Sequence, residues 1–102
     1  IIMAGYDSEE VAQIYNIDLF GSMTTEKFIS TGSGSPVAYG YLETEFRDNL
    51  KVDDGYKVAI RAIAAAIRRN AGTGDGINVV IIDKDGFREL PKETKDAVKV
   101  AY

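Results

Sequence analysis

The segment of residues 52–69 constrains the fold more than any other part of this sequence. Asp53 and Asp54 suit the positive amino end of a helix, and Arg68 and Arg69 suit the negative carboxyl end. Between them, apolar residues recur at the spacing of one helix face: Val58, Ala59, Ala62, Ile63, Ala66 and Ile67. The segment therefore predicts an amphipathic helix, whose apolar stripe must be buried against another element.

Shorter patterns on both sides of this helix predict strands and two further helices. Ser35 is a favoured N-cap, Pro36 fits a first helical turn, and Pro91 marks a similar start near the end of the chain. The predicted strands cover residues 1–6, 11–21, 27–31, 77–83 and 87–90, with turns at 21–26 and 83–86. The resulting order, β-β-β-α-α-β-β-α, predicts an α+β fold in which helices pack on an antiparallel sheet.

Composition excludes several classes of function. The chain has no cysteine, which excludes a disulfide and a thiolate metal site, and no histidine, which excludes a Ser-His-Asp or Cys-His catalyst within these residues. A net charge of -4 argues against a nucleic-acid partner, which usually requires a basic surface. No apolar run approaches the roughly 18 residues needed to cross a bilayer, and no signal-peptide pattern is present. We expect a cytoplasmic protein that uses no metal or cofactor.

Two glycine-rich segments, residues 30–36 and 72–76, each lie beside a predicted helix end. Such loops can bind anions, because glycine lets the backbone approach a ligand and a helix amino end offers free N–H groups. Neither segment has the spacing of a P-loop or of a dinucleotide-binding turn, so a tight turn is the simpler interpretation. Asp83–Gly86 contains a fragment of a calcium loop without its further ligands, and predicts a hairpin turn. The residues alone therefore predict an α+β unit without an assigned reaction.

Two long segments at fixed separation carry a resemblance to a known family. The sequences STGSGSPVAYGYLE, residues 30–43, and IRAIAAAIRRNAGTGDGINVVIID, residues 60–83, resemble the second half of archaeal-type proteasome β subunits. The short motifs AGYD and YNIDLFG, which precede them, also resemble the strands before the glycine-rich turn in that family. The resemblance implies part of the four-layer αββα sandwich of the N-terminal-nucleophile hydrolases. Residues 1–102 are then expected to form the carboxy-terminal portion of a single β-type domain, with the amino-terminal half absent.

The resemblance also implies an activity and an assembly. Family members are threonine endopeptidases in which a mature amino-terminal threonine is the nucleophile and its own α-amine, or an associated water, is the base. Residue 1 is isoleucine here, and Thr24, Thr25 and Thr31 are internal, so these residues alone are expected to be inactive. The expected partners are other β subunits in a heptameric ring, flanking rings of α subunits, and unfolded protein or peptide substrates, but neither nucleic acid nor a membrane.

Four residues match functional positions of the family. Ser33 matches a serine that forms a hydrogen bond near the terminal amine, and Thr73 matches a supporting serine. Asn70 stands where the family usually has aspartate, so hydrogen bonding is kept and the negative charge is lost. Asp18 matches a position that lines the substrate pocket of the adjacent subunit.

The aspartate-to-asparagine difference leaves two functions open, a catalytic subunit and a non-catalytic structural subunit of the ring. A third alternative is an independent binding module that uses the glycine-rich turns. If the chain is half of a sandwich, we expect the inner face of its sheet to be exposed as an apolar patch.

Overall fold

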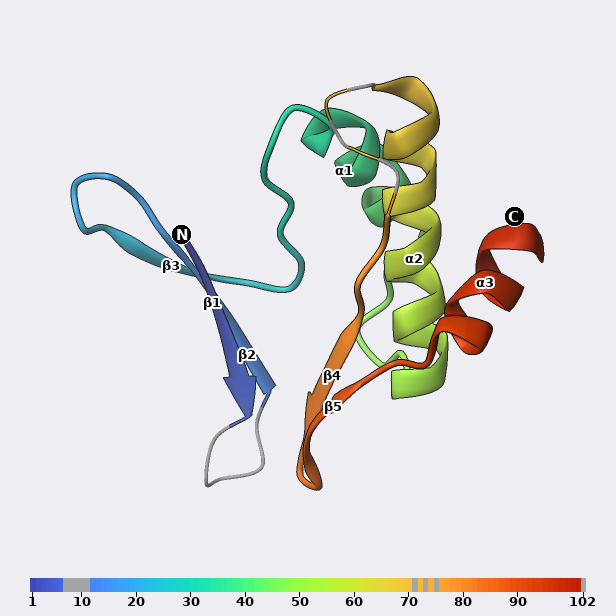
Figure 1. The fold of residues 1–102 in the computed structure, drawn as a ribbon. Coiled ribbons are helices and arrows are strands. Elements are labelled where there is room, and N and C mark those ends of the chain that lie inside the picture. The colour runs from blue at the N-terminus through green and yellow to red at the C-terminus, as the bar shows by residue number, and fades with distance from the viewer. Residues whose placement is uncertain (7–11, 71, 73, 75, 102) are drawn as a thin grey trace.

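The computed structural model describes residues 1–6, 12–70, 72, 74 and 76–101, and its elements follow the predicted order (Figure 1). Strands and helices alternate in groups, which confirms the predicted α+β class. The elements are β1 (Ile2–Tyr6), β2 (Ala12–Ile17), β3 (Met23–Glu26), α1 (Ser35–Glu45), α2 (Val52–Arg69), β4 (Val80–Asp83), β5 (Gly86–Glu89) and α3 (Lys92–Ala101).

The strands form two antiparallel sheets. In the first, β2 is central and pairs with β1 and β3, so that Tyr15 lies opposite both Met3 and Thr25. In the second, β4 pairs with β5, and Ile82 lies opposite Phe87. Figure 1 shows the β4–β5 hairpin between the three-stranded sheet and the helices, and β1 of that sheet contacts β4.

The third strand lies earlier in the sequence than predicted. The structure places β3 at Met23–Glu26, where a turn was predicted, and residues 27–31 are not a strand. The cause is the Asp18 side chain, which closes the preceding turn directly after β2, so that the β-branched Thr24 and Thr25 join the sheet. Phe28 packs instead against Phe46, with ring centroids 5.1 Å apart.

The core lies along α2, which packs between α1 and α3 (Figure 1). Ile60 of α2 is completely buried. The other described apolar residues that are buried are mostly small, which lets the helices approach closely: Ala38, Ala62, Ala64, Ala66, Ile81 and Val98. The predicted ends of α2 are confirmed, since it carries two acidic residues in its first turn and two basic residues in its last. The N-cap of α1 is Gly34 and not the predicted Ser35, which is the first residue of the helix.

The predicted apolar stripe of α2 is only partly buried. Ala62 and Ala66 are buried as expected, but Ala59 and Ile63, in the middle of the same stripe, are exposed. At the helical spacing, Ile60 and Ala64 form a second buried arc on the far side of this exposed strip. The reason is that α2 packs against two helices, α1 and α3, and these contacts leave Ala59 and Ile63 exposed.

The turn at residues 83–86 is a hairpin turn, as predicted. Gly86 has a φ of 103°, which favours glycine, and Asp83 accepts a hydrogen bond from the backbone N–H of Asp85 at 2.9 Å. The Arg88 guanidinium donates to the Asp83 carboxylate at 2.9 Å, and this bond holds the pKa of Asp83 below its ordinary value. No group of three or more potential metal ligands occurs among the described residues.

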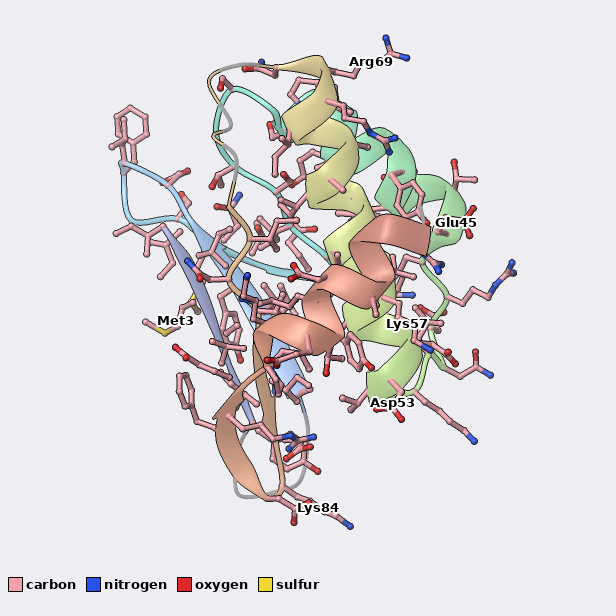
Figure 2. All side chains as sticks on the ribbon, turned by 45° about the vertical axis from the view of Figure 1, so that its right-hand side comes forward. Met3, Glu45, Asp53, Lys57, Arg69 and Lys84 are labelled. Atoms are coloured by element: carbon pink, nitrogen blue, oxygen red, sulfur yellow. The ribbon has the colours of Figure 1, made fainter. Side chains whose placement is uncertain are left out.

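Several large apolar side chains lie on the outside of the two sheets. Val80, Ile82 and Phe87 are 41%, 41% and 69% exposed on one face of the β4–β5 hairpin, and Met3 of β1 is 56% exposed. Figure 2 shows Met3 on the side of the molecule away from the helix residues Glu45 and Lys57. In the part of the chain that the structure describes, no helix is long and apolar enough to cross a membrane.

Candidate functional site

Two segments that are distant in the sequence meet beside the paired helices. Ser33 lies in the glycine-rich turn directly before α1, and Asn70 directly follows Arg69, the last residue of α2. Because α1 and α2 pack against each other, the start of the first helix lies close to the end of the second (Figures 1 and 2). The packing of the two helices therefore brings Ser33 and Asn70 into contact.

The side chain of Asn70 makes three hydrogen bonds that join these segments. Its Nδ2 donates to the backbone carbonyl of Ser33 at 3.0 Å, and its Oδ1 accepts from the backbone N–H of Gly72 at 2.8 Å. The Ser33 hydroxyl donates to the same Oδ1 at 3.3 Å. One carboxamide thus holds both glycine-rich segments.

Gly72 lies very close to the Ser33 and Asn70 side chains. A Cβ atom at position 72 would lie 2.8 Å from Ser33 Oγ, so that the hydroxyl or the turn would have to move, and 3.1 Å from Asn70 Oδ1, which is a tight contact. The sequence did not single out Gly72, although the glycine-rich pattern around it was a usable signal for close backbone approach.

A hollow of about 210 Å³ lies between the Ser33 turn and the two helices. Three hydroxyl-bearing residues of the turn line one side of it, and apolar residues of α1 and α2 line the other: Ser30, Thr31, Ser33, Ala38, Ile63 and Ala66. Ile63, from the exposed strip of α2, therefore faces this hollow. A small polar group can bind at the turn while apolar atoms contact the helices.

The structure brings together two of the four residues that the sequence singled out. Ser33 and Asn70 are in direct contact, whereas Thr73 lies outside the described residues. Asp18 lies in the turn between β2 and β3, and Figure 1 shows this turn on the side of the three-stranded sheet away from the helices. Within this chain, Asp18 and the Ser33–Asn70 pair therefore form separate sites.

The Asp18 carboxylate stabilises its own turn. Its Oδ1 accepts hydrogen bonds from the backbone N–H groups of Phe20 and Ser22, both at 2.9 Å. This turn presents Leu19 and Phe20, which are 100% and 94% exposed.

Replacing Asp18 by alanine is expected to lower the free energy of unfolding by about 0.5–2 kcal/mol, because two backbone donors lose their acceptor, as at a helix N-cap. Asp18→Asn keeps an acceptor oxygen and is expected to stay near the wild-type value. Denaturant titration of the three proteins measures both effects. Equal losses in the alanine and asparagine variants would show that charge, rather than this hydrogen bonding, is what Asp18 contributes.

A larger open hollow, of about 650 Å³, lies on another part of the helix pair and is lined by Val37, Ala65, Arg68 and Arg69. Both arginines are exposed, as expected for basic residues at a helix carboxyl end. The hollow does not include Ser33 or Asn70.

Comparison with known proteins identifies what the chain is similar to. The family model described as "Proteasome subunit" matches residues 1–82. The protein named "Proteasome subunit beta 2" of Nitrosopumilus maritimus is 57% identical over 98 residues, which are 96% of this chain and 46% of that protein. A protein of the same name from Cenarchaeum symbiosum is 54% identical, again over 96% of this chain and 46% of its own length.

A third relative, "Proteasome subunit beta" of Methanopyrus kandleri, is 45% identical over 91% of this chain and 44% of its own length. The chain therefore spans about half the length of the curated relatives that it matches.

Proposed function

Because this chain belongs to the proteasome subunit family, and its relatives are named β subunits, we propose that it is the carboxy-terminal part of a β subunit of the proteasome core particle. The chain corresponds to about half the length of those relatives. The exposed strip of α2 around Ile63 and the exposed apolar face of the β4–β5 hairpin support this proposal, because both are surfaces that further structure would cover.

The proposed activity is threonine-type endopeptidase activity, which degrades proteins to peptides. The hydroxyl oxygen of an amino-terminal threonine, outside these residues, attacks the peptide carbonyl carbon, and its proton passes to the threonine α-amine. The leaving amine takes up a proton as the peptide bond breaks, and water then hydrolyses the ester. The observation that carries the proposal is the contact of Ser33 with Asn70 beside the hydroxyl-lined hollow, in a member of this family.

The present residues have a supporting role in that reaction. The Ser33 hydroxyl accepts a hydrogen bond from the threonine α-amine and so orients it. The Thr73 hydroxyl supports the same group, and Asn70 holds the turn.

The proposed partners are the other subunits of the particle, β subunits in a heptameric ring and α subunits in flanking rings, and the proposed location is the cytoplasm. The β2–β3 turn is the proposed contact with a neighbouring β subunit, since Leu19 and Phe20 project almost fully into solvent. Asp18 would then lie next to the substrate pocket of that neighbour.

A non-catalytic structural subunit is the second candidate, and Asn70 is the observation that favours it. An amide at this position provides no negative charge to a neighbouring amine or lysine. A structural subunit would keep the helix pair and the ring contacts without turning over peptides.

Peptide hydrolysis by the particle assembled from the native polypeptide distinguishes a catalytic subunit from a structural one. We expect Ser33→Ala to lower kcat about 10- to 100-fold, which corresponds to the loss of one hydrogen bond to a charged group. Thr44→Ala, which removes an exposed hydroxyl from α1, is the matched control and is expected to leave kcat unchanged. A correctly assembled particle with an amino-terminal threonine and no hydrolysis would contradict the enzymatic proposal and support the structural one.

A further inference from the structure

We propose that Asn70 is a positioning residue whose amide, rather than a carboxylate, is the group that this site requires. Its carboxamide bridges two segments through a donor and an acceptor at once. Nδ2 donates to the Ser33 carbonyl at 3.0 Å while Oδ1 accepts from Gly72 N–H at 2.8 Å. The inference deepens the proposed function, and the expected effect on catalysis rests on that function. The hydrogen bonding of Asn70 with Ser33 and Gly72 does not depend on it.

The hydrogen bonds fix the direction of the amide. If the side chain were rotated by half a turn, its NH₂ group would face the Gly72 N–H, and its oxygen would face the Ser33 carbonyl oxygen. Both pairs would be repulsive, since two donors or two acceptors cannot bond. The amide therefore has one satisfied orientation.

That orientation determines which way the Ser33 hydroxyl bonds. The amide oxygen Oδ1 can only accept, so Ser33 must donate its single proton to it across the 3.3 Å contact. The lone pairs of Ser33 Oγ then remain for a second partner. Among the described residues that line the adjoining hollow, none is charged, so a group that enters it meets Ser33 as an acceptor. A donor such as an α-amine fits this arrangement.

A carboxylate at position 70 could not make the same set of bonds. It would still accept from Gly72 and Ser33, but its second oxygen would face the Ser33 carbonyl oxygen, where the amide now donates at 3.0 Å. The repulsion between these oxygens would push the Ser33 turn away from the end of α2. The resemblance to family members with aspartate leads to the opposite expectation, that a carboxylate would improve the site.

Asn70→Asp in the native polypeptide tests the inference, with Asn49→Asp as the matched control. Asn49 is exposed in the connection between α1 and α2, so this control adds the same charge away from the site. Asn70→Ala removes the donor and the acceptor together. We expect the backbone amide of Ser35, which bonds Gly32 within the turn, to exchange with deuterium roughly tenfold faster in both Asn70 variants than in the control.

The kinetic measurements distinguish a role of Asn70 in orienting the Ser33 turn from a general loss of stability. In an active particle, we expect Asn70→Asp to lower kcat roughly tenfold with an unchanged KM, because the turn orients the reacting amine and does not bind the peptide. A kcat equal to or above that of Asn49→Asp, or unchanged exchange at Ser35, would overturn the inference. If the native particle hydrolyses no peptide, the proposed enzymatic function fails by itself. The exchange at Ser35 then decides the inference alone, faster exchange supporting it and unchanged exchange overturning it.

Discussion

Ile60→Ala is expected to lower the free energy of unfolding by about 2–5 kcal/mol, the range for removing a large aliphatic side chain from a packed core. Ile60 is 0% exposed and lies on α2, where the other buried residues of the helix are alanines. Small neighbours cannot move to fill the space that the lost atoms leave, so the cavity should persist. Denaturant titration of the native polypeptide measures the effect.

Two further variants serve as comparisons for Ile60→Ala. Ile60→Val removes one methyl group and is expected to cost about 0.5–1.5 kcal/mol. Val52→Ala, at the exposed start of the same helix, is expected to change stability by less than about 0.5 kcal/mol. If Ile60→Ala and Val52→Ala cost the same, the burial pattern described for α2 would be wrong.

Gly72→Ala is expected to have the second largest effect, a loss of about 1–3 kcal/mol in unfolding free energy, which is typical of overpacking. The new Cβ would lie 2.8 Å from Ser33 Oγ, so the hydroxyl must rotate or the turn must move. Either response breaks the bond from Ser33 to Asn70. Under the proposed endopeptidase function, we therefore also expect slower peptide hydrolysis by the assembled particle, at the same assay conditions as the wild type.

Gly76→Ala is the matched control for this prediction. It makes the same change four residues later, at a glycine without a positive φ, where the new Cβ would have no neighbouring atom within 4 Å. Its expected effect on stability is within about 0.5 kcal/mol. A similar loss in both variants would mean that glycine flexibility in this segment matters, and that the contact with Ser33 does not.

The helices and the order of elements could be predicted because their signals are local. Pro36 in the first turn of α1, and the charged residues at both ends of α2, act through backbone geometry and the helix dipole, which the sequence shows directly. The position of β3 could not be predicted in this way. It depends on where the Asp18 side chain closes the preceding turn, and a side-chain acceptor for two backbone donors has no periodic pattern.

The burial pattern of α2 and the details of the candidate site also depend on contacts between elements, which the sequence does not show directly. Periodicity placed Ala62 and Ala66 in the core correctly, but it missed the buried Ile60 and Ala64. The exposure of Ala59 and Ile63 depends on which neighbours are present. For the site, the resemblance singled out Ser33 and Asn70, and the structure shows that they touch. The role of Gly72 and the donor function of the Asn70 amide required the fold, since both depend on contacts between segments that the helix pair brings together.

The separation of Ser33 and Asn70 along the chain has a consequence for the order of folding. The two residues are 37 positions apart, and the loop that their contact closes contains α1 and α2. Closing a disordered loop of that length costs more entropy than one or two exposed hydrogen bonds return. The helices must therefore form and pack first, after which their ends are already neighbours. In a growing or newly released polypeptide, the Ser33–Asn70 contact therefore stays unformed until this helical hairpin is complete.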